Sequence, residues 1–347
     1  MKKLALLASL SLGAAFAQDL NGAGASFPDP LYQEMFAAYN EEFGIQVNYQ
    51  AIGSGGGRSA LLDQTVDFAG TDAAFSDEEL ADAPGTILHI PTASGAVVLG
   101  YNFAPLAEEP EGGLTLSGEV VADIFLGNIT EWSDPAIAEL NPGAELPDLP
   151  ITVAHRSDGS GTTAIFVDYL AKVSEQWASE VSTGPQTSVS WPTGIGGDGN
   201  AGVTNIIAQT PGAIGYVALE YAIENNVTYA NMINAAGNTV EATLDAVAAA
   251  ADVEMPADLR ATFTNSENPD AWPVAGFTWV VMYEDQNYAG RSRERAQQTL
   301  DLIRWMITDG QRFNNPLNYG QITGFPQERA LELLDGVNYG GQPLSGN

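Results

Sequence analysis

The stretch Ala154–Thr163, which reads A-H-R-S-D-G-S-G-T-T, is the part of the sequence around which we expect the fold to be organised. The apolar residues 151–154 predict a strand, and apolar side chains at helical spacing from Ile165 to Val173 predict a helix. The first N–H groups of a helix lack partners within it, and the helix dipole is positive at that end. The turn is therefore a candidate anion site.

The side chains of this turn also suit an anion. Ser160 and Thr162 can donate from their hydroxyls, Arg156 offers a planar fork of donors, and Asp158 is placed to pair with Arg156. No Asp or Glu occurs from residue 159 to 167, although the chain holds 44 of them, so the positive helix end is left open. The alternative is an ordinary turn in which Asp158 or Ser160 caps the helix.

Composition limits the possible partners. The 347 residues are enough for two domains, and the net charge of -32 argues against nucleic acid or an anionic membrane surface as a partner. With no Cys and two His, neither a disulfide nor a metal site of the usual His/Cys type is expected, and no cofactor is indicated. We expect His89, in an apolar run, to be a packed residue rather than a ligand.

Residues 1–17 have the pattern of a signal peptide. Lys2 and Lys3 form a positive start, an apolar run follows, and A-F-A at 15–17 is a typical cleavage site. We expect cleavage after Ala17 and export to the periplasm. Because the chain has no Cys, we expect no lipid anchor there.

Two further glycine-rich turns follow predicted strands, at 21–30 with Ser26 and Phe27 and at 53–57 with Ser54. Their plainer interpretations are a tight turn capped by Ser26 and a merely flexible turn at 53–57. The turn at 53–57 is not a P-loop, since G-K-[ST] is missing. Residues 66–74 predict a short strand that ends in Asp72. Four such strand ends favour an α/β fold with a parallel sheet and a ligand crevice at the carboxyl ends of its strands.

Two long apolar runs, Thr86–Asn102 and Trp272–Tyr283, suit strands that pass between two lobes. A predicted helix near the C-terminus carries much of the positive charge, at Arg291, Arg293, Arg295 and Arg304. We expect these arginines to pair with the acidic surface; an external partner is the alternative.

Together these motifs resemble a known family over essentially all of residues 19–344. The matching segments are G-A-G-A-S-F-P at 22–28, V-N-Y-Q-A-I-G-S-G-G-G at 47–57, V-D-F-A-G-T-D at 66–72, R-S-D-G-S-G-T at 156–162, P-G-A-I-G-Y-V at 211–217 and D-A-W-P at 270–273. The chain resembles the periplasmic phosphate-binding protein of the ABC-type phosphate importer. The resemblance implies a binding protein rather than an enzyme, with inorganic phosphate and the importer's membrane permease subunits as partners, and a monomer.

The resemblance also implies a two-lobed periplasmic-binding-protein (Venus-flytrap) fold of the α/β class, with two crossing strands between the lobes. Lobe I would comprise residues 18–92 and 272–347, and lobe II residues 93–271. Phosphate would be held in the cleft between them. By the family pattern, the phosphate-binding residues are Ser26, Phe27, Ser54, Asp72, Arg156, Ser160, Gly161 and Thr162. In that pattern Asp158 orients Arg156, and Asp72 accepts the proton of the phosphate.

The chemistry of Asp72 alone, apart from the family resemblance, supports selectivity for phosphate over sulfate. Near neutral pH phosphate keeps a proton and sulfate keeps none. A buried carboxylate can therefore accept a hydrogen bond from phosphate, but it would face only the lone pairs of sulfate, which is unfavourable. Two other functions stay open at this point. One is an exported phosphate-ester hydrolase, although no catalytic triad or metal cluster is visible. The other is a binder of another oxyanion such as arsenate, which is protonated like phosphate.

Overall fold

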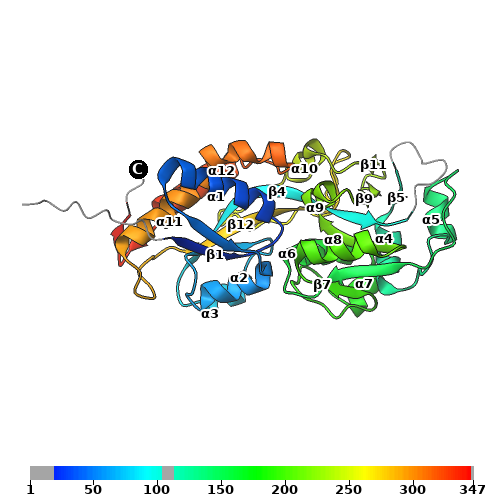
Figure 1. Ribbon diagram of the computed structural model, residues 1–347, viewed down its shortest axis with the longest axis horizontal. Coiled ribbons are helices and arrows are strands. Elements are labelled where there is room, and N and C mark those ends of the chain that lie inside the picture. The colour runs from blue at the N-terminus through cyan, green and yellow to red at the C-terminus, as the bar shows by residue number, and fades with distance from the viewer. Residues whose placement is uncertain (1–18, 104–112, 345–347) are drawn as a thin grey trace, which may run out of the picture.

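The computed structural model describes residues 19–103 and 113–344, so the predicted signal peptide lies outside the described residues. These residues form two α/β lobes side by side, joined in the middle of the long axis, as Figure 1 shows. The first lobe contains both ends of the described chain, and the second contains its middle. The expected two-lobed α/β architecture is confirmed.

One nine-stranded mixed sheet runs through both lobes in the order β2-β1-β3-β12-β4-β8-β6-β7, and β9 pairs with β4 off this path. Its strands are β1 (Leu20–Gly24), β2 (Val47–Gln50), β3 (Phe68–Thr71), β4 (Ile87–Tyr101), β6 (Thr152–Arg156), β7 (Ile195–Gly197), β8 (Ala213–Ala218), β9 (Thr228–Tyr229) and β12 (Ala275–Tyr283). β1, β2 and β3 are parallel to one another, and so are β6, β7 and β8. The expected parallel pairing therefore occurs once in each lobe.

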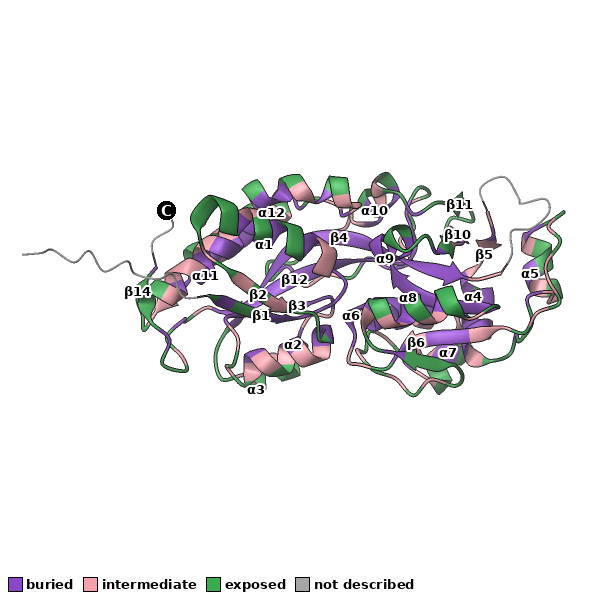
Figure 2. Cartoon of the chain, in the orientation of Figure 1, coloured by how far each residue is buried: buried purple, intermediate pink, exposed green. Residues whose placement is uncertain are grey.

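β4 is the strand that joins the lobes. Its residues 87–96 pair with β12, whereas residues 97–101 pair with β8. The return crossing lies beside it, because the N–H of Val97 donates to the carbonyl of Val274 just before β12 begins (2.8 Å). Both strands are buried along their whole length, which explains why they read as unbroken apolar runs (Figure 2).

Helices cover this sheet in both lobes (Figure 1). They are α1 (Asp29–Phe43), α2 (Gly53–Leu62), α3 (Asp77–Asp82), α4 (Gly118–Leu126), α5 (Pro135–Leu140), α6 (Gly161–Val173), α7 (Glu175–Glu180), α8 (Gly199–Gln209), α9 (Leu219–Glu224), α10 (Leu244–Ala250), α11 (Arg293–Met306) and α12 (Phe325–Asp335). A small sheet of β5 (Thr115–Leu116), β10 (Asn231–Ile233) and β11 (Thr239–Val240) completes the second lobe. Among the described residues, none of the helices combines the length and apolar character needed to span a bilayer.

Pro91 does not interrupt β4, because the sheet takes it up in a bulge. The register shifts there, so that Ala93 faces Thr278 while Pro91 faces Trp279, and Thr92 is left without an opposite residue. The Thr92 hydroxyl instead contacts the hydroxyl of Tyr32 (2.7 Å). The bulge lies beside Thr278, which contacts the functional site described below.

The stretch 256–263 lies within the sequence range expected for lobe II, yet it contacts the first lobe. Arg260 donates to the carbonyl of Phe75 (2.8 Å) and pairs with Asp77 (2.6 Å). The indole N–H of Trp279 donates to the carbonyl of Leu259 (2.9 Å). The contacts between the lobes therefore extend beyond the two crossing strands.

Candidate functional site

All eight residues expected to bind the anion are buried at the boundary between the lobes. Ser26 and Phe27 follow β1, Ser54 lies in the first turn of α2, and Asp72 follows β3. From the other lobe come Arg156 at the end of β6 and residues 160–162 at the start of α6. The structure thus brings together turns that are far apart in the sequence, at the carboxyl ends of parallel strands.

The turn between β6 and α6 has the local structure that its sequence predicts. Ser160 is the N-cap of α6, and its hydroxyl oxygen accepts the N–H of Thr163 (3.0 Å). Because this bond uses a lone pair, the hydroxyl proton of Ser160 stays available for a ligand. The capped turn that we weighed as an alternative is therefore present and is compatible with an anion site.

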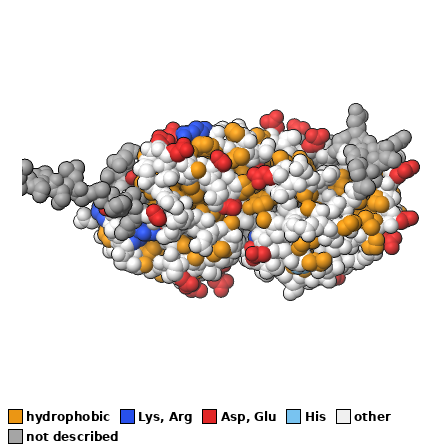
Figure 3. Space-filling view, in the orientation of Figure 1, with side chains coloured by type: hydrophobic (Ala, Val, Ile, Leu, Met, Phe, Trp, Pro, Cys, Tyr) orange, Lys and Arg blue, Asp and Glu red, His pale blue; other side chains and the backbone are white. Residues whose placement is uncertain are grey.

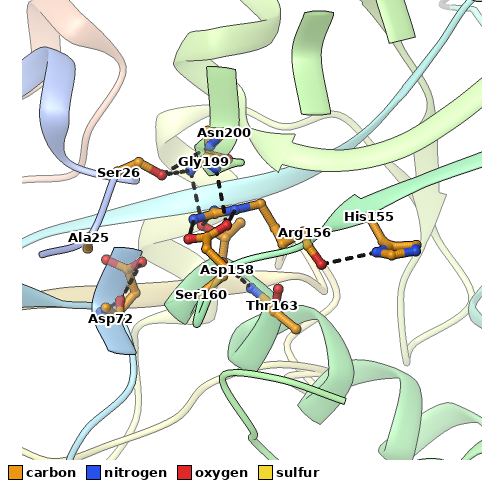
Figure 4. A network of polar contacts seen from close by, with 12 residues as sticks. Ala25, Ser26, Asp72, His155, Arg156, Asp158, Ser160, Thr163, Gly199 and Asn200 are labelled. Atoms are coloured by element: carbon orange, nitrogen blue, oxygen red, sulfur yellow. Dashed lines mark hydrogen bonds and ion pairs between the residues drawn. The ribbon is translucent and has the colours of Figure 1, made fainter. Parts of the chain in front are cut away.

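Arg156 is held in place from two sides (Figure 4). Its Nε donates to Oδ1 of Asp158 (2.6 Å), and its Nη1 lies 3.4 Å from the hydroxyl of Thr162. Burial would raise the pKa of Asp158, but hydrogen bonds from Arg156 and its charge hold that pKa below its usual value. Asp158 thus stays ionised and fixes the guanidinium, the positioning role that the sequence predicts for it.

The glycine-rich segment after β2 differs from the prediction, which placed a turn at residues 53–57. Helix α2 begins at Gly53, so the glycines form its first turns. A Cβ on Gly57 would lie 2.4 Å from Cα of Gly24, and one on Gly55 would lie 3.1 Å from Cα of Gly159. The glycines are therefore needed because other backbone segments approach closely, and this outweighs their poor helix propensity.

Asp72 is a buried carboxyl with few partners. Its Oδ1 accepts from the hydroxyl of Thr278 (2.8 Å), and its backbone N–H donates to the hydroxyl oxygen of Ser54 (3.1 Å). Burial raises the pKa of Asp72 to about 7, although the bond from Thr278 and the charge of Arg156 act against this rise. The group can therefore gain or lose a proton near neutral pH.

The turn after β1 contributes a hydroxyl and holds its backbone firmly. The carbonyl of Ser26 accepts from the hydroxyl of Tyr221 (2.8 Å), and the carbonyl of Phe27 accepts from that of Tyr319 (2.6 Å). Ser26 does not cap α1, whose N-cap is Pro28. The cap that we weighed as the alternative for Ser26 is therefore wrong, although the chain does turn there and the carbonyl of Ser26 accepts the N–H of Asp29 (3.2 Å).

Our sequence analysis missed Gly199 and Asn200 in this site. They begin α8, directly after β7, and Figure 4 shows them between Ser26 and Asp158. The N–H of Gly199 donates to Oδ1 of Asp158 (3.1 Å), and the side-chain amide of Asn200 donates to Ser26 (2.9 Å). The signal was present, because I-G-G-D-G-N is another short strand followed by a glycine-containing helix start.

Both histidines lie outside this cluster of hydroxyls and carboxylates. Nε2 of His89 accepts the N–H of Phe75 (3.1 Å), and burial lowers the pKa of His89 to about 3, which confirms it as a packed residue. His155 stacks on Trp191, with ring centroids 5.0 Å apart. Within residues 19–103 and 113–344, no group of three or more His, Asp or Glu side chains is arranged to hold a metal ion.

Three of the four arginines near the C-terminus pair with carboxylates of the molecule, as expected, and the fourth contacts a backbone carbonyl. Arg291 and Arg295 pair with Asp67, Arg304 pairs with Asp335, and Arg293 donates to the carbonyl of Pro343. These contacts favour the interpretation of an internally paired basic face over that of an external partner.

Comparison with known proteins assigns the chain to a family. A family model described as a PBP superfamily domain matches residues 12–310. The phosphate-binding protein PstS of Xylella fastidiosa is 42% identical over 303 residues, covering 86% of this chain and 80% of that protein. PstS of Pasteurella multocida is 40% identical over 319 residues, covering 91% and 90%. The chain belongs to the PstS family of phosphate-binding proteins.

A solved structure agrees with this PstS-family fold. A high affinity periplasmic phosphate-binding protein (PfluDING), bound with phosphate, superposes with a TM-score of 0.70 and is 21% identical. The match covers 91% of this chain and 93% of that one. At this level of identity the likeness concerns the fold.

In this PstS-family protein the two lobes touch across the site. The N–H of Gly55 donates to the carbonyl of Gly159 (2.8 Å), and Asn200 reaches Ser26. A cavity of 520 Å³ adjoins the site, and Asp72, Arg58, Asp168 and Arg260 are among the residues that line it. The site is thus enclosed by protein, with solvent-sized space on the side of Asp72.

Proposed function

We propose that this protein binds inorganic phosphate between its two lobes and delivers it to the permease subunits of an ABC-type importer. The family relationship supports the ligand, since the relatives at 40–42% identity are named phosphate-binding proteins. The observation that carries the proposal is the enclosed cluster of hydroxyl, N–H and guanidinium donors with one proton acceptor, Asp72. This combination matches an oxyanion that carries a single proton.

The binding residues in this proposal are Ser26, Phe27, Ser54, Asp72, Arg156, Ser160, Gly161 and Thr162. Their burial, and the contacts of Arg156 and Asp72, support the assignment. We further propose residues 18–92 with 272–347 and residues 93–271 as the two lobes, closing about the crossings near Val97 and Val274. A monomer in the periplasm, exported by cleavage after Ala17, completes the proposal.

In this proposal the protein is a carrier of phosphate and not a phosphatase. A hydrolase of the serine type needs a base beside its nucleophile, and both histidines of the chain lie away from Ser26, Ser54 and Ser160. The carboxylate of Asp72 faces Ser54, but its Oδ2 lies 3.5 Å from that hydroxyl, a long contact for a general base. This arrangement favours holding an anion over attacking one.

Isothermal titration of phosphate, sulfate and arsenate into the mature protein tests this function. We expect phosphate to bind with one site per chain and sulfate to bind far more weakly. A chromogenic phosphatase assay on the same preparation should show no turnover. Absence of phosphate binding, or turnover of the ester, would contradict the proposal, and tighter binding of arsenate would reassign the ligand.

A further inference from the structure

Asn200 is a fully buried side chain in the first turn of α8, and it touches polar groups from both lobes. Its side-chain Nδ2 lies 2.9 Å from the hydroxyl oxygen of Ser26 and 3.2 Å from that of Thr162. Its backbone N–H also donates to Ser26 (3.1 Å). Figure 4 shows it facing Ser26 across the boundary between the lobes.

The orientation of this amide is fixed by a group that can only donate. The backbone N–H of Ala218 donates to Oδ1 of Asn200 (2.9 Å). A backbone N–H never accepts, so the oxygen of the amide must face Ala218 and the NH₂ must face the two hydroxyls. Asn200 can therefore act only as a donor toward Ser26 and Thr162.

This has a consequence for both hydroxyls. A hydroxyl has one proton to donate and two lone pairs with which to accept. The Ser26 oxygen receives two N–H groups of Asn200, and the Thr162 oxygen receives Nδ2 of Asn200 and lies 3.4 Å from Nη1 of Arg156. With their lone pairs occupied, each hydroxyl must point its proton elsewhere, and both lie in the proposed anion site.

We propose that Asn200 is a positioning residue that makes Ser26 and Thr162 pure hydrogen-bond donors to the anion and links the two lobes around it. The inference rests on the proposed phosphate-binding function. It explains selectivity for protonation state: with both hydroxyls held as donors, only Asp72 can accept, so the site has a place for one ligand proton. Two titratable groups contact these residues directly: Nη1 of Arg156 lies 3.4 Å from the Thr162 hydroxyl, and the hydroxyl of Tyr221 donates to the carbonyl of Ser26. Two carboxylates lie beside their neighbours, since Asp158 accepts the N–H of Gly199 and a Cβ on Gly161 would lie 2.6 Å from Asp72.

The test is the variant Asn200→Asp, which keeps the shape of the side chain but replaces its donor by an acceptor. Ionised Asp would draw the two hydroxyl protons toward itself and turn lone pairs toward the anion. We expect phosphate affinity to fall by about a hundredfold or more, because the two contacts from Ser26 and Thr162 to the anion are reversed. The matched control is Asn205→Asp, the same change on an exposed position of α8, which should bind like the parent.

Two further measurements separate positioning from damage to the fold. Lowering the pH should narrow the difference in phosphate affinity between Asn200→Asp and Asn205→Asp, because a protonated carboxyl at position 200 can donate again. A misfolded site would not recover its affinity in this way. The second measurement is a double-mutant cycle of Asn200→Ala and Ser26→Ala. The effects of the two substitutions on phosphate affinity should be strongly non-additive, with a coupling of about tenfold. This cycle remains informative if Asn200→Asp does not fold, as judged by its thermal unfolding.

The outcomes are distinct. Parent-like binding by Asn200→Asp, or additive effects in the cycle with Ser26, would overturn the role of Asn200 while leaving phosphate binding intact. If the parent protein itself binds no phosphate in the same titration, the proposed function fails, and the inference on Asn200 fails with it.

Discussion

Replacing Asp72 by Asn should change which anions the site accepts. In the parent protein the carboxylate is 4% exposed, and its Oδ1 is engaged by Thr278. The other oxygen faces toward Ser54 and the start of α6, where a Cβ on Gly161 would lie 2.6 Å from Oδ2. A fully deprotonated anion there would set lone pairs against a carboxylate. In Asp72→Asn the amide can accept from Thr278 and donate its NH₂ to a bare oxygen.

The size of the effect follows from the burial of the group. An unsatisfied buried polar group costs about 1–3 kcal/mol, and more when it is charged. At about 1.4 kcal/mol per tenfold, the ratio of phosphate to sulfate affinity should fall by about tenfold to a thousandfold, mainly because sulfate gains. Phosphate should still bind appreciably, since the donors of Arg156 and α6 are unchanged.

Competition titrations should be run about one unit below and one unit above the Asp72 pKa of about 7. Below that pKa the parent carboxyl is protonated and can donate, so the parent already tolerates sulfate better and the contrast with the variant should be smaller. Above it the contrast should be largest. The control Asp82→Asn removes the same charge from an exposed position on α3. If the ratio equals that of the parent at both pH values, Asp72 is a structural residue and selectivity lies elsewhere.

Three other substitutions probe separate parts of the argument. Arg156→Ala should weaken phosphate binding by about 2–5 kcal/mol in titrations, because it also leaves Asp158 unpaired; unchanged affinity would remove Arg156 from the site. Gly161→Ala should leave thermal stability intact but weaken phosphate binding, because the added Cβ would lie 2.4 Å from Oγ of Ser54. With phosphate present, the radius of gyration of this variant should stay larger than that of the parent. The control Gly184→Ala, which adds a Cβ in open space, should behave as the parent. Burial raises the pKa of Glu220 well above 4.5. Above about pH 4.5 the folded state therefore keeps a proton that the unfolded state has lost, so Glu220 lowers the free energy of unfolding as the pH rises. Glu220→Gln should flatten that decline in denaturant unfolding, and parallel pH profiles of the variant and parent would contradict it.

The sequence predicts the architecture well because its strongest signals are local. Strands followed by glycine-rich turns and amphipathic helices predict the α/β class, and both long apolar runs are strands in the structure. Ser160 caps α6 and Asp158 pairs with Arg156, as residues a few positions apart can be expected to do. Such contacts depend on spacing that can be read directly from the chain.

What the sequence analysis missed depends on contacts between distant segments. The early start of α2 is explained only when Gly24 and Gly159 lie against its glycines. Asn200 gains its role from Ser26, which is 174 residues away, and from the N–H of Ala218. A buried amide in a helix start has no local pattern that tells which hydroxyls it will meet.

The proposed anion site also has to function within a strongly acidic protein. The net charge is -32, and on the face shown in Figure 3 acidic side chains are spread over both lobes while few basic ones are seen. Exposed charges are screened over about 8–10 Å in physiological salt, so the nearest groups dominate the field in an enclosed site. Among the described helices α2, α5, α6 and α8 lack an acidic residue in the first turn, and three of these four begin at the site.

The positions of the acidic residues therefore matter more than their number. α1, α3, α4, α7, α9, α10, α11 and α12 each carry Asp or Glu in the first turn, as helices commonly do. At α2 and α6 the positive helix ends are not neutralised in this way. The start of α8 differs, because Asp198 is its N-cap residue and its Gly199 N–H donates to Asp158, which also holds Arg156. Asp72 is then the carboxylate left to meet the ligand. In the proposed anion site, the absence of acidic residues from the first turns of α2 and α6 would thus leave a single carboxylate, Asp72, to control which anion stays.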